Sequence, residues 1–334
     1  MNPDRPPCDD PARLAAFLGA LGLAGAECRP LTGDASSRRY QRILGAGRPP
    51  LILMQAPDPA RELVPFVAIA GRLAGAGLSV PGILAADADA GLLLLEDFGD
   101  ETFTARLGRG ADPASLYALA TDVLITLHQS AISTAGLPLF DEAAFLAQVM
   151  LLPEIVFPLG SNCHFEFEMA WRAVLPLGLA GPSSLLLRDY HAGNLMHLPH
   201  RPGVRACGLL DFQDAGAGPA VYDLISLIED ARRDLPAALG EQLFARYLAA
   251  FPALDGAALR TACGVLAAVR HTRVIAVFLR LARTGKPGYL QHLPRLWRYL
   301  DRRLTQPELA PLAGWFSRHL PPDRRAQLIT ESKP

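Results

Sequence analysis

Lysine is nearly absent from this sequence. Only Lys286 and Lys333 occur among the 32 basic residues, so almost all of the positive charge is carried by arginine. Coding bias is the simpler explanation, and bidentate recognition of anions by guanidinium groups is the functional one.

An excess of charge of one sign is also lacking, because the net charge is −1. Such a balance gives no long-range field toward nucleic acid or an anionic membrane, so we expect neither as a partner. We also expect no obligate protein partner.

Paired cysteines are missing as well. The five cysteines are scattered and none stands in a C-x-x-C pair, which argues against a zinc knuckle or a dithiol redox motif. The polar N-terminus has no apolar signal-peptide core, and no apolar run approaches the roughly 18 residues of a membrane span. With 50% hydrophobic and 19% charged residues, we expect a globular protein of the reducing cytoplasm.

Repeats and low-complexity segments are absent too, and the hydrophobic pattern changes near residue 100. The first part predicts helices over 11–23 and 60–76, where Pro65 favours a late start or a kink. Its strands are predicted in "ECRPL", "RRYQRIL", "PLILMQAP", "GILAAD" and "GLLLLEDF". Later helices are predicted over 113–130, 141–150, 164–179, 221–234, 236–251, 257–283 and 289–304, with short β pieces between 184 and 212.

The sequence therefore predicts an α+β protein with two parts. Residues 1–98 form the small β-rich part, of which about the first ten are expected to be disordered. Residues 99–334 form the larger, mostly helical part.

A polar island interrupts an apolar stretch at "LLLRDYHAGNLMHL". The segment predicts a loop between short strands, from which Asp189 and Asn194 point into one cavity. Farther along, the strand "ACGLL" delivers Asp211 to a loop edge. A carboxylate placed as a base, with an amide oxygen and a second carboxylate for a hard divalent cation, suits phosphoryl transfer. Each of these signals is weak alone, and their combination is much stronger.

Together these segments resemble the protein-kinase-like fold, in the branch of aminoglycoside phosphotransferases and related small-molecule kinases. "LRDYHAGN" stands where that fold has H-R-D-x-x-x-x-N, and "LDFQD" stands where it has D-F-G. The resemblance implies two lobes, ATP as the phosphoryl donor, Asp189 as catalytic base, and Asn194 and Asp211 as Mg²⁺ ligands. It also implies that Asp223, in "GPAVYDLISLIED", supports the catalytic loop from within.

The same resemblance locates the nucleotide. "TGDASSRRY" would cover the phosphates, which gives nucleotide contacts to Gly33, Ser36, Ser37, Arg38 and Arg39. An ordinary polar hairpin is the alternative interpretation of that segment. "LLLLEDFG" would be the hinge, whose backbone at Glu96, Asp97 and Phe98 would bind adenine.

One departure from the fold's pattern is sharp. Its third strand normally carries a lysine for the phosphates, but "PLILMQAP" has Met54 there and no lysine nearby. Either the chain is an inactive kinase or another cation replaces the lysine, and Arg38 and Arg39 are the candidates. Glu62 is either the helix acid that usually pairs with the lysine or a plain surface glutamate.

Most of the chain also resembles a narrower family, the bacterial anomeric kinases of N-acetylmuramate and N-acetylglucosamine in cell-wall recycling. "GDASSRRY", "RDYHAGNLM" and "LLDFQDAGAGPAVYDLISL" carry this likeness. It implies that an anomeric hydroxyl is phosphorylated in the cytoplasm, as part of peptidoglycan recycling. The predicted substrate-binding residues are His191, Asp214, Glu229, Asp230, Arg270 and His271.

For several of these residues an alternative stays open. His191 could orient the catalytic loop, and Glu229 and Asp230 could form a solvated helix face. Arg270, His271 and Arg273 share one helix and are candidates for the lactyl carboxylate of N-acetylmuramate, although surface salt bridges are the simpler interpretation.

Two other functions compete with the sugar kinase. One is a kinase of an aminoglycoside or another small alcohol. The other is a nucleotide-binding regulator without turnover, which the missing lysine suggests.

Overall fold

The structure is a computed structural model that describes residues 7–31, 37–45 and 47–332. The chain divides into two compact units, each made of two segments. The sheet unit consists of Met1–Ser133 and Ala192–Ala215, and the helical unit consists of Thr134–His191 and Gly216–Pro334. The expected boundary at residue 98 comes from the sequence alone and stays a prediction.

Of the first ten or so residues, which the sequence predicts to be disordered, residues 1–6 lie outside the described part of the chain. Residues Pro7–Asp9 form a 3-10 helix, and the side chain of Cys8 is 1% exposed. Gln55 donates a hydrogen bond from Nε2 to the carbonyl oxygen of Cys8 at 2.7 Å, which ties this segment to the sheet.

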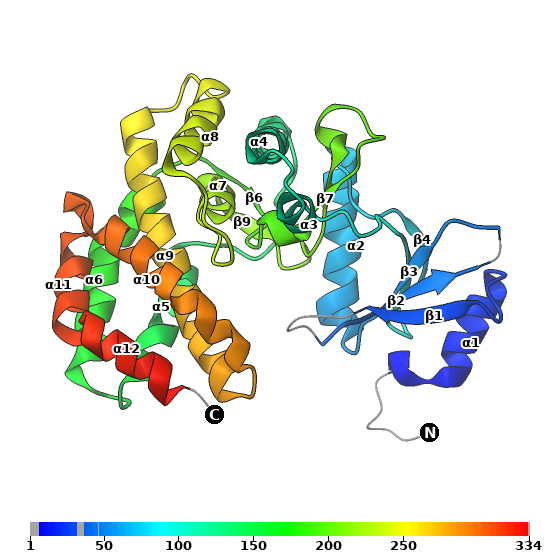
Figure 1. Cartoon of the computed structure of the whole chain (residues 1–334), viewed down its shortest axis with the longest axis horizontal. Helices are drawn as coiled ribbons and strands as arrows, with labels where there is room; N and C mark the ends of the chain where they lie inside the picture. Colours follow the sequence, from blue (N-terminus) through cyan, green and yellow to red (C-terminus); the bar gives the residue numbers. More distant parts are fainter. Residues whose placement is uncertain (1–6, 32–36, 46, 333–334) are drawn as a thin grey trace. The chain divides into compact units, whose positions relative to one another are not determined.

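The sheet unit, which contains the blue and cyan strands of Figure 1, is built on a five-stranded antiparallel sheet with the order β1-β2-β3-β5-β4. Its central strands are apolar because both faces are covered, and the leucines of β5 are almost completely buried. Every strand lies within a segment that the sequence predicted. The strands are β1 (Glu27–Leu31), β2 (Arg39–Leu44), β3 (Leu51–Gln55), β4 (Ile83–Asp87) and β5 (Leu92–Glu96).

Two helices flank this sheet. Helix α1 (Pro11–Ala20) packs Leu18 into the core that it shares with β2, β3 and β5. Helix α2 (Pro59–Gly75) begins where Asp58 accepts a hydrogen bond from the backbone of Arg61, with a proline as its first residue. Of the two alternatives at Pro65, the late start is wrong, because this cap starts the helix at residue 59 and Pro65 lies inside it. The kink stays a prediction.

The sheet unit also contains α3 (Phe103–Gly108), α4 (Pro113–Gln129) and the hairpin of β7 (Leu195–His197) and β8 (Cys207–Leu209). The hairpin is anchored where the backbone N–H of Leu209 donates to the carbonyl of Ser79 at 2.8 Å. A further bridge joins Thr102 to Met196.

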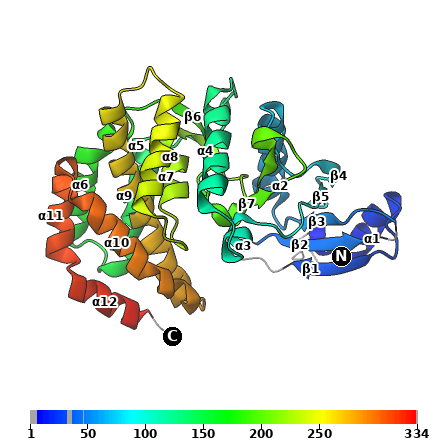
Figure 2. The ribbon, with the colours of Figure 1, turned by 45° about the horizontal axis from the view of Figure 1, so that its top comes forward.

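The helical unit is organised around one long helix, α9 (Gly256–Arg283), which packs against α5, α6, α7 and α10 (Figure 2). In the described part of the chain, α9 is the one helix long and apolar enough to cross a membrane. However, 83% of its apolar window is buried inside the protein, as in the core helix of a helical domain.

The remaining elements of this unit surround α9. They are α5 (Glu142–Val156), α6 (Asn162–Gly178), α7 (Val221–Ile228), α8 (Ala237–Ala249), α10 (Leu293–Leu304), α11 (Ala310–His319), α12 (Pro322–Glu331) and the hairpin of β6 (Ser183–Leu186) and β9 (Gly216–Pro219). The sequence predicted α5 to α10 but missed α3, α11 and α12. Helix α7 ends at Ile228, six residues before its predicted end, and the next residue, Glu229, belongs to a buried polar cluster.

Candidate active site

The loop that carries Asp189 leaves β6 in the helical unit and is held by α7. Asp223, on α7, is completely buried and accepts hydrogen bonds from the backbone N–H groups of Leu187 at 2.6 Å and Arg188 at 2.8 Å. Burial raises the pKa of Asp223 to about 7, against the opposing effect of these two donors. Arg188 has φ of 72°, a conformation that a residue other than glycine keeps only when its surroundings enforce it. Asp223 therefore supplies the support that its sequence position implied.

A second contact from α7 holds the same loop through a side chain that the sequence analysis did not single out. Ser226, one helical turn after Asp223, donates from Oγ to the carbonyl oxygen of Arg188 at 3.3 Å. Ser226 in turn accepts a hydrogen bond from Nε of Arg270 at 3.0 Å. Arg270 also donates from Nη1 to the carbonyl oxygen of Glu229 at 3.0 Å. A continuous polar chain thus runs from α9, through α7, to the residue that precedes Asp189.

The electrostatic surroundings keep Asp189 ionised. Burial by itself would raise the pKa of this carboxyl, but the positive charges of Arg273 and Arg188 outweigh that effect and hold the pKa below its ordinary value. An ionised carboxylate only accepts hydrogen bonds, so Asp189 is suited to take up a hydroxyl proton.

His191 lies two residues farther along the loop and is 6% exposed. Burial lowers the pKa of His191, so its ring is neutral at pH 7. Nη1 of Arg232 lies 3.2 Å from Nε2 of His191. Because a guanidinium can only donate, we infer that Nε2 accepts and that the ring proton is on Nδ1. Asp230, which is 2% exposed, accepts a hydrogen bond from the backbone of Arg232 at 2.9 Å.

Three other predicted substrate residues lie inside the helical unit. Glu229, Arg270 and His271 are between 0% and 3% exposed. Oε2 of Glu229 lies 2.6 Å from Nε2 of His271, and the same carboxylate pairs with Arg302 and Arg303. Burial would raise the pKa of Glu229, but His271 and the two arginines lower it well below the usual range. The glutamate is thus ionised and internally satisfied, and a substrate contact by any of the three stays a prediction.

The predicted metal ligands lie in the sheet unit, at one end of the β7–β8 hairpin. Asn194 precedes β7. Its backbone carbonyl oxygen accepts a hydrogen bond from the backbone N–H of Leu210 at 3.0 Å. Asp211 follows β8 with φ of 58°, and its side chain is 43% exposed. The hairpin register pairs Leu195 with Leu209, so Asn194 and Asp211 leave the hairpin at the same end. An amide oxygen and an accessible carboxylate fit Mg²⁺, which commonly takes one or two protein ligands and completes its shell with phosphate and water.

Arg38 approaches this pair from the start of β2. It is 8% exposed and donates from Nη2 to Oδ1 of Asp211 at 2.7 Å and from Nη1 to Oε1 of Gln213 at 2.6 Å. Nε2 of Gln213 also donates to Oδ1 of Asp211, at 3.1 Å. Asp214, the remaining predicted residue of this segment, is exposed and lies 3.4 Å from Nε2 of Gln213. The role of Gln213 was not predicted, although it lies between the two aspartates that the sequence singled out.

The sheet register relates Arg38 to the strand position at which the lysine is missing. Tyr40 on β2 pairs with Met54 on β3, so their side chains lie on the same face of the sheet. Arg38 stands two residues before Tyr40, the spacing at which side chains share a face of a strand. Arg39 is different, because its side chain is 50% exposed and pairs with Asp9.

The loop expected over the phosphates is described only at its end. Gly33 and Ser36 lie outside the described residues. Ser37 donates from Oγ to the carboxylate of Glu62, which also accepts from the backbone N–H of Asp58 at 3.2 Å. Glu62 is 9% exposed, so the surface alternative is wrong: it joins the start of α2 to this loop.

The three hinge residues have side chains held within the sheet unit. Glu96 pairs with Arg201 and accepts from the backbone N–H of Gly82 at 3.2 Å. Asp97 pairs with Arg42 at 2.5 Å, and the Phe98 ring lies 5.0 Å from the Arg201 guanidinium. These contacts fix the hinge side chains, while adenine binding by its backbone stays a prediction.

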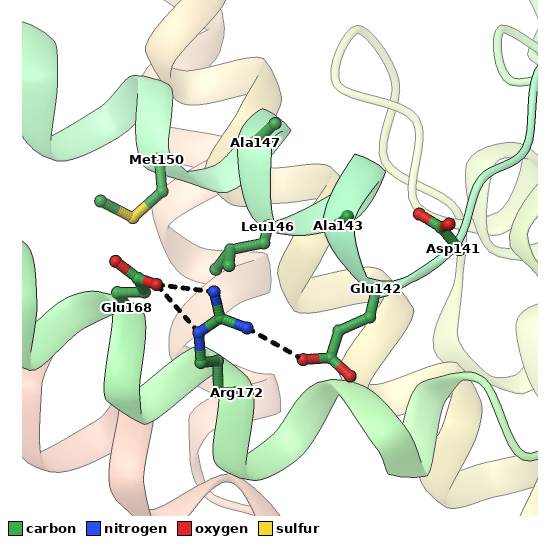
Figure 3. A pocket seen from close by; sticks show the side chains of 8 residues that line it. All are labelled: Asp141, Glu142, Ala143, Leu146, Ala147, Met150, Glu168 and Arg172. Carbon is green, nitrogen blue, oxygen red and sulfur yellow. Dashed lines mark hydrogen bonds and ion pairs between the residues drawn. The ribbon is translucent and has the colours of Figure 1, made fainter.

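A separate hollow of about 590 Å³ lies between α5 and α6 (Figure 3). Arg172 stands in it between the carboxylates of Glu142 and Glu168. None of the predicted site residues lines it; its lining consists of Asp141, Glu142, Ala143, Leu146, Ala147, Met150, Glu168 and Arg172.

Comparison with known proteins agrees with this arrangement. Residues 27–259 match the phosphotransferase enzyme family. The chain is 36% identical to the N-acetylmuramate/N-acetylglucosamine kinase of Caulobacter vibrioides, over 94% of this chain and 98% of that protein. It is 38% identical to the protein of the same name from Pseudomonas aeruginosa, over 86% and 87%.

Solved structures share the fold at lower identity. A choline/ethanolamine kinase family protein from Mesorhizobium loti has a TM-score of 0.62 at 18% identity, and the match covers 96% of this chain and 97% of that one. Aminoglycoside 2'-phosphotransferase-IIIa has a TM-score of 0.61 at 14% identity, covering 89% and 99%. The predicted fold class, α+β with a protein-kinase-like arrangement, is confirmed. The chain belongs to the phosphotransferase enzyme family.

Proposed function

We propose that this protein is a cytoplasmic ATP-dependent sugar kinase that phosphorylates the anomeric hydroxyl of N-acetylmuramate, N-acetylglucosamine or both, in peptidoglycan recycling. The observation that carries the proposal is the presence of Asp189, Asn194 and Asp211 in a chain that is 36% identical, over 94% of its length, to a kinase named for these two sugars. Free thiols at all five cysteines are consistent with the cytoplasm, where ATP is available.

Asp189 is proposed as the catalytic base. Its carboxylate accepts the proton of the anomeric hydroxyl while that oxygen attacks the γ-phosphate of ATP in line. An anomeric hydroxyl is more acidic than an ordinary alcohol, so a carboxylate with a low pKa suffices when it mainly orients the nucleophile. Asp223 and Ser226 bind the backbone N–H and the carbonyl oxygen of Arg188, the residue before Asp189, which supports a fixed position of the catalytic loop.

Asn194 and Asp211 are proposed to hold Mg²⁺. The ion, when bound, would neutralise charge on the ATP phosphates. Arg38 is the better substitute for the missing lysine, because it is buried beside Asp211 whereas Arg39 is half exposed and paired with Asp9. A guanidinium presents two N–H groups to a phosphate at once, so one arginine can take over the lysine's electrostatic role.

The test is phosphorus NMR of the purified protein with Mg-ATP and either sugar. We expect a new sugar 1-phosphate signal. One ADP and one sugar 1-phosphate should form for each ATP consumed. A phosphate ester at another sugar position would overturn the anomeric assignment. ATP left intact with both sugars would overturn the sugar, and a panel of aminoglycosides and amino alcohols would then separate another acceptor from a regulator without turnover.

A further inference from the structure

Arg273 is a partly buried arginine on α9 without a hydrogen bond or ion pair to any residue in the described part of the chain. This sets it apart from Arg270 on the same helix, whose guanidinium is bound to Ser226 and to the carbonyl of Glu229. The charge of Arg273 acts on the ionised carboxylate of Asp189 in the catalytic loop. A guanidinium that makes no hydrogen bond within the described residues has N–H groups that can donate to a ligand.

The helix geometry places Arg273 beside the catalytic loop. Arg270 is joined through Ser226 to the carbonyl of Arg188, so this face of α9 lies under the loop that carries Asp189. Arg273 is three residues farther along the same helix, a spacing at which side chains are neighbours on one face.

The charge pattern agrees with this placement. Among the cations that act on Asp189, Arg273 has the largest effect on the carboxylate, larger than that of Arg188 in the loop itself. Arg273 therefore lies near the carboxylate of Asp189, the proposed base for the acceptor hydroxyl.

The two proposed acceptors differ in one such group. N-acetylmuramate is N-acetylglucosamine with a lactyl ether on C3, and the lactyl group ends in a carboxylate. A planar carboxylate matches the fork of a guanidinium, and the contact is charge-assisted. We propose that Arg273 binds the lactyl carboxylate of N-acetylmuramate and thereby sets the preference between the two sugars, an inference that rests on the proposed function.

This role has a kinetic signature of its own. A carboxylate on C3 takes no part in the reaction at C1, so its contact stabilises the ground state and the transition state alike and changes KM more than kcat. The effect of Arg273 on Asp189, in contrast, is common to both sugars. It cancels in the ratio of kcat/KM for N-acetylmuramate to kcat/KM for N-acetylglucosamine.

The experiment compares wild type and one variant on three acceptors. Wild type and Arg273→Gln are assayed with N-acetylmuramate, its methyl ester and N-acetylglucosamine. Loss of a charge-assisted hydrogen bond should lower the kcat/KM ratio of N-acetylmuramate to N-acetylglucosamine by roughly tenfold to a hundredfold. The ester, which has no charge, should show no such change. Arg273→Lys should restore part of the ratio, and its KM for N-acetylmuramate should rise with salt.

Arg280 provides the matched control. It is an exposed arginine two turns farther along α9, and Arg280→Gln should leave the ratio unchanged. An unchanged ratio in Arg273→Gln, with both sugars still phosphorylated by wild type, would overturn the role of Arg273 alone. Equal losses for all three acceptors would also overturn it, because they would assign Arg273 to the phosphoryl group. If wild type phosphorylated neither sugar, the proposed function would fail and the inference with it.

Discussion

Arg38 donates to Oδ1 of Asp211 at 2.7 Å, which joins the cation expected to replace a missing lysine to a carboxylate expected to bind magnesium. The two residues are 173 positions apart in the chain. Arg38 is buried in this contact, whereas Arg39 is half exposed and paired with Asp9, so the surroundings of two adjacent arginines that the sequence could not separate are different.

The first prediction concerns these arginines. Arg38→Met should weaken Mg-ATP binding by roughly tenfold to a hundredfold, as expected for the loss of a charge-assisted contact to phosphate. Arg39→Met should change the affinity less than twofold, because its exposed pair with Asp9 contributes little. Isothermal titration calorimetry measures both. Equal effects of the two changes would refute the assignment of Arg38.

The second prediction concerns the base. Asp189→Asn keeps the shape of the side chain but removes its ability to accept a proton. We expect kcat to fall by about 10²- to 10⁴-fold, with ATP affinity nearly unchanged. A coupled ADP-release assay and calorimetry give the two quantities, and full activity in this variant would remove Asp189 from the mechanism.

The third prediction tests the clamp on the catalytic loop. Ser226→Ala removes the hydroxyl that donates to the carbonyl of Arg188, so the loop before Asp189 loses one of its supports. We expect kcat to fall by up to about 10²-fold, as for a small misplacement of a reacting group. The free energy of unfolding should fall by about 1 kcal/mol.

Thr121 offers a matched control for that variant. Its hydroxyl donates to the carbonyl of Tyr117 inside α4 at 2.9 Å and is also completely buried. Thr121→Val should lose a similar free energy of unfolding while kcat stays at the wild-type value. Equal kcat values in the two variants would show that the contact of Ser226 is structural only.

The fourth prediction concerns the buried cluster around Glu229. Glu229→Gln leaves His271, Arg302 and Arg303 without their shared carboxylate. Breaking a buried ion pair in this way typically costs about 3–5 kcal/mol, and we expect the lower end because Arg302 is half exposed. Glu241→Gln, in an exposed pair with Arg260, should cost less than about 1 kcal/mol. Urea denaturation compares the variants, and equal losses would contradict the prediction.

The fifth prediction is a pH dependence. Burial lowers the pKa of His128 to about 4. Between the ordinary histidine pKa and that value the unfolded chain binds a proton that the folded chain does not, so stability falls as the pH falls through this window. The loss attributable to His128 is at most about 3 kcal/mol. The free energy of unfolding of wild type should therefore fall relative to that of His128→Gln from pH 6.5 to pH 4; a difference that stays constant over this range would contradict the low pKa.

The sequence predicted the parts of the fold that depend on local pattern. Strands such as β3 and β5 are short apolar runs bounded by turns, and helices such as α4 begin at an aspartate cap followed by proline. The segment "RDYHAGN" predicted a loop between short strands, and in the structure it lies between β6 and β7. Helices α11 and α12 were missed because their periodicity is weakened by proline, glycine and charged residues.

The burial and the contacts of the site residues could not be predicted from the sequence in the same way, because they depend on residues far away in the chain. Glu229 lies at the end of a short helix, and it becomes a buried, paired ion only because the fold brings His271, Arg302 and Arg303 to its carboxylate. Glu62 resembles a surface glutamate until the fold brings Ser37 to it. Ser226 is an ordinary helix residue in sequence, and its role depends on the position of the carbonyl of Arg188.

Helix α9 has a consequence for how this kinase can acquire a new acceptor. Arg270 and Arg273 are carried by a helix whose apolar window is 83% buried, and close-packed interiors tolerate changes of volume poorly. With Arg273 in its proposed role, acceptor preference would be inherited together with the folding core. Libraries that randomise only surface loops would then leave the preference intact, whereas retargeting would need a change at Arg273 with compensating changes in the helices that pack around it.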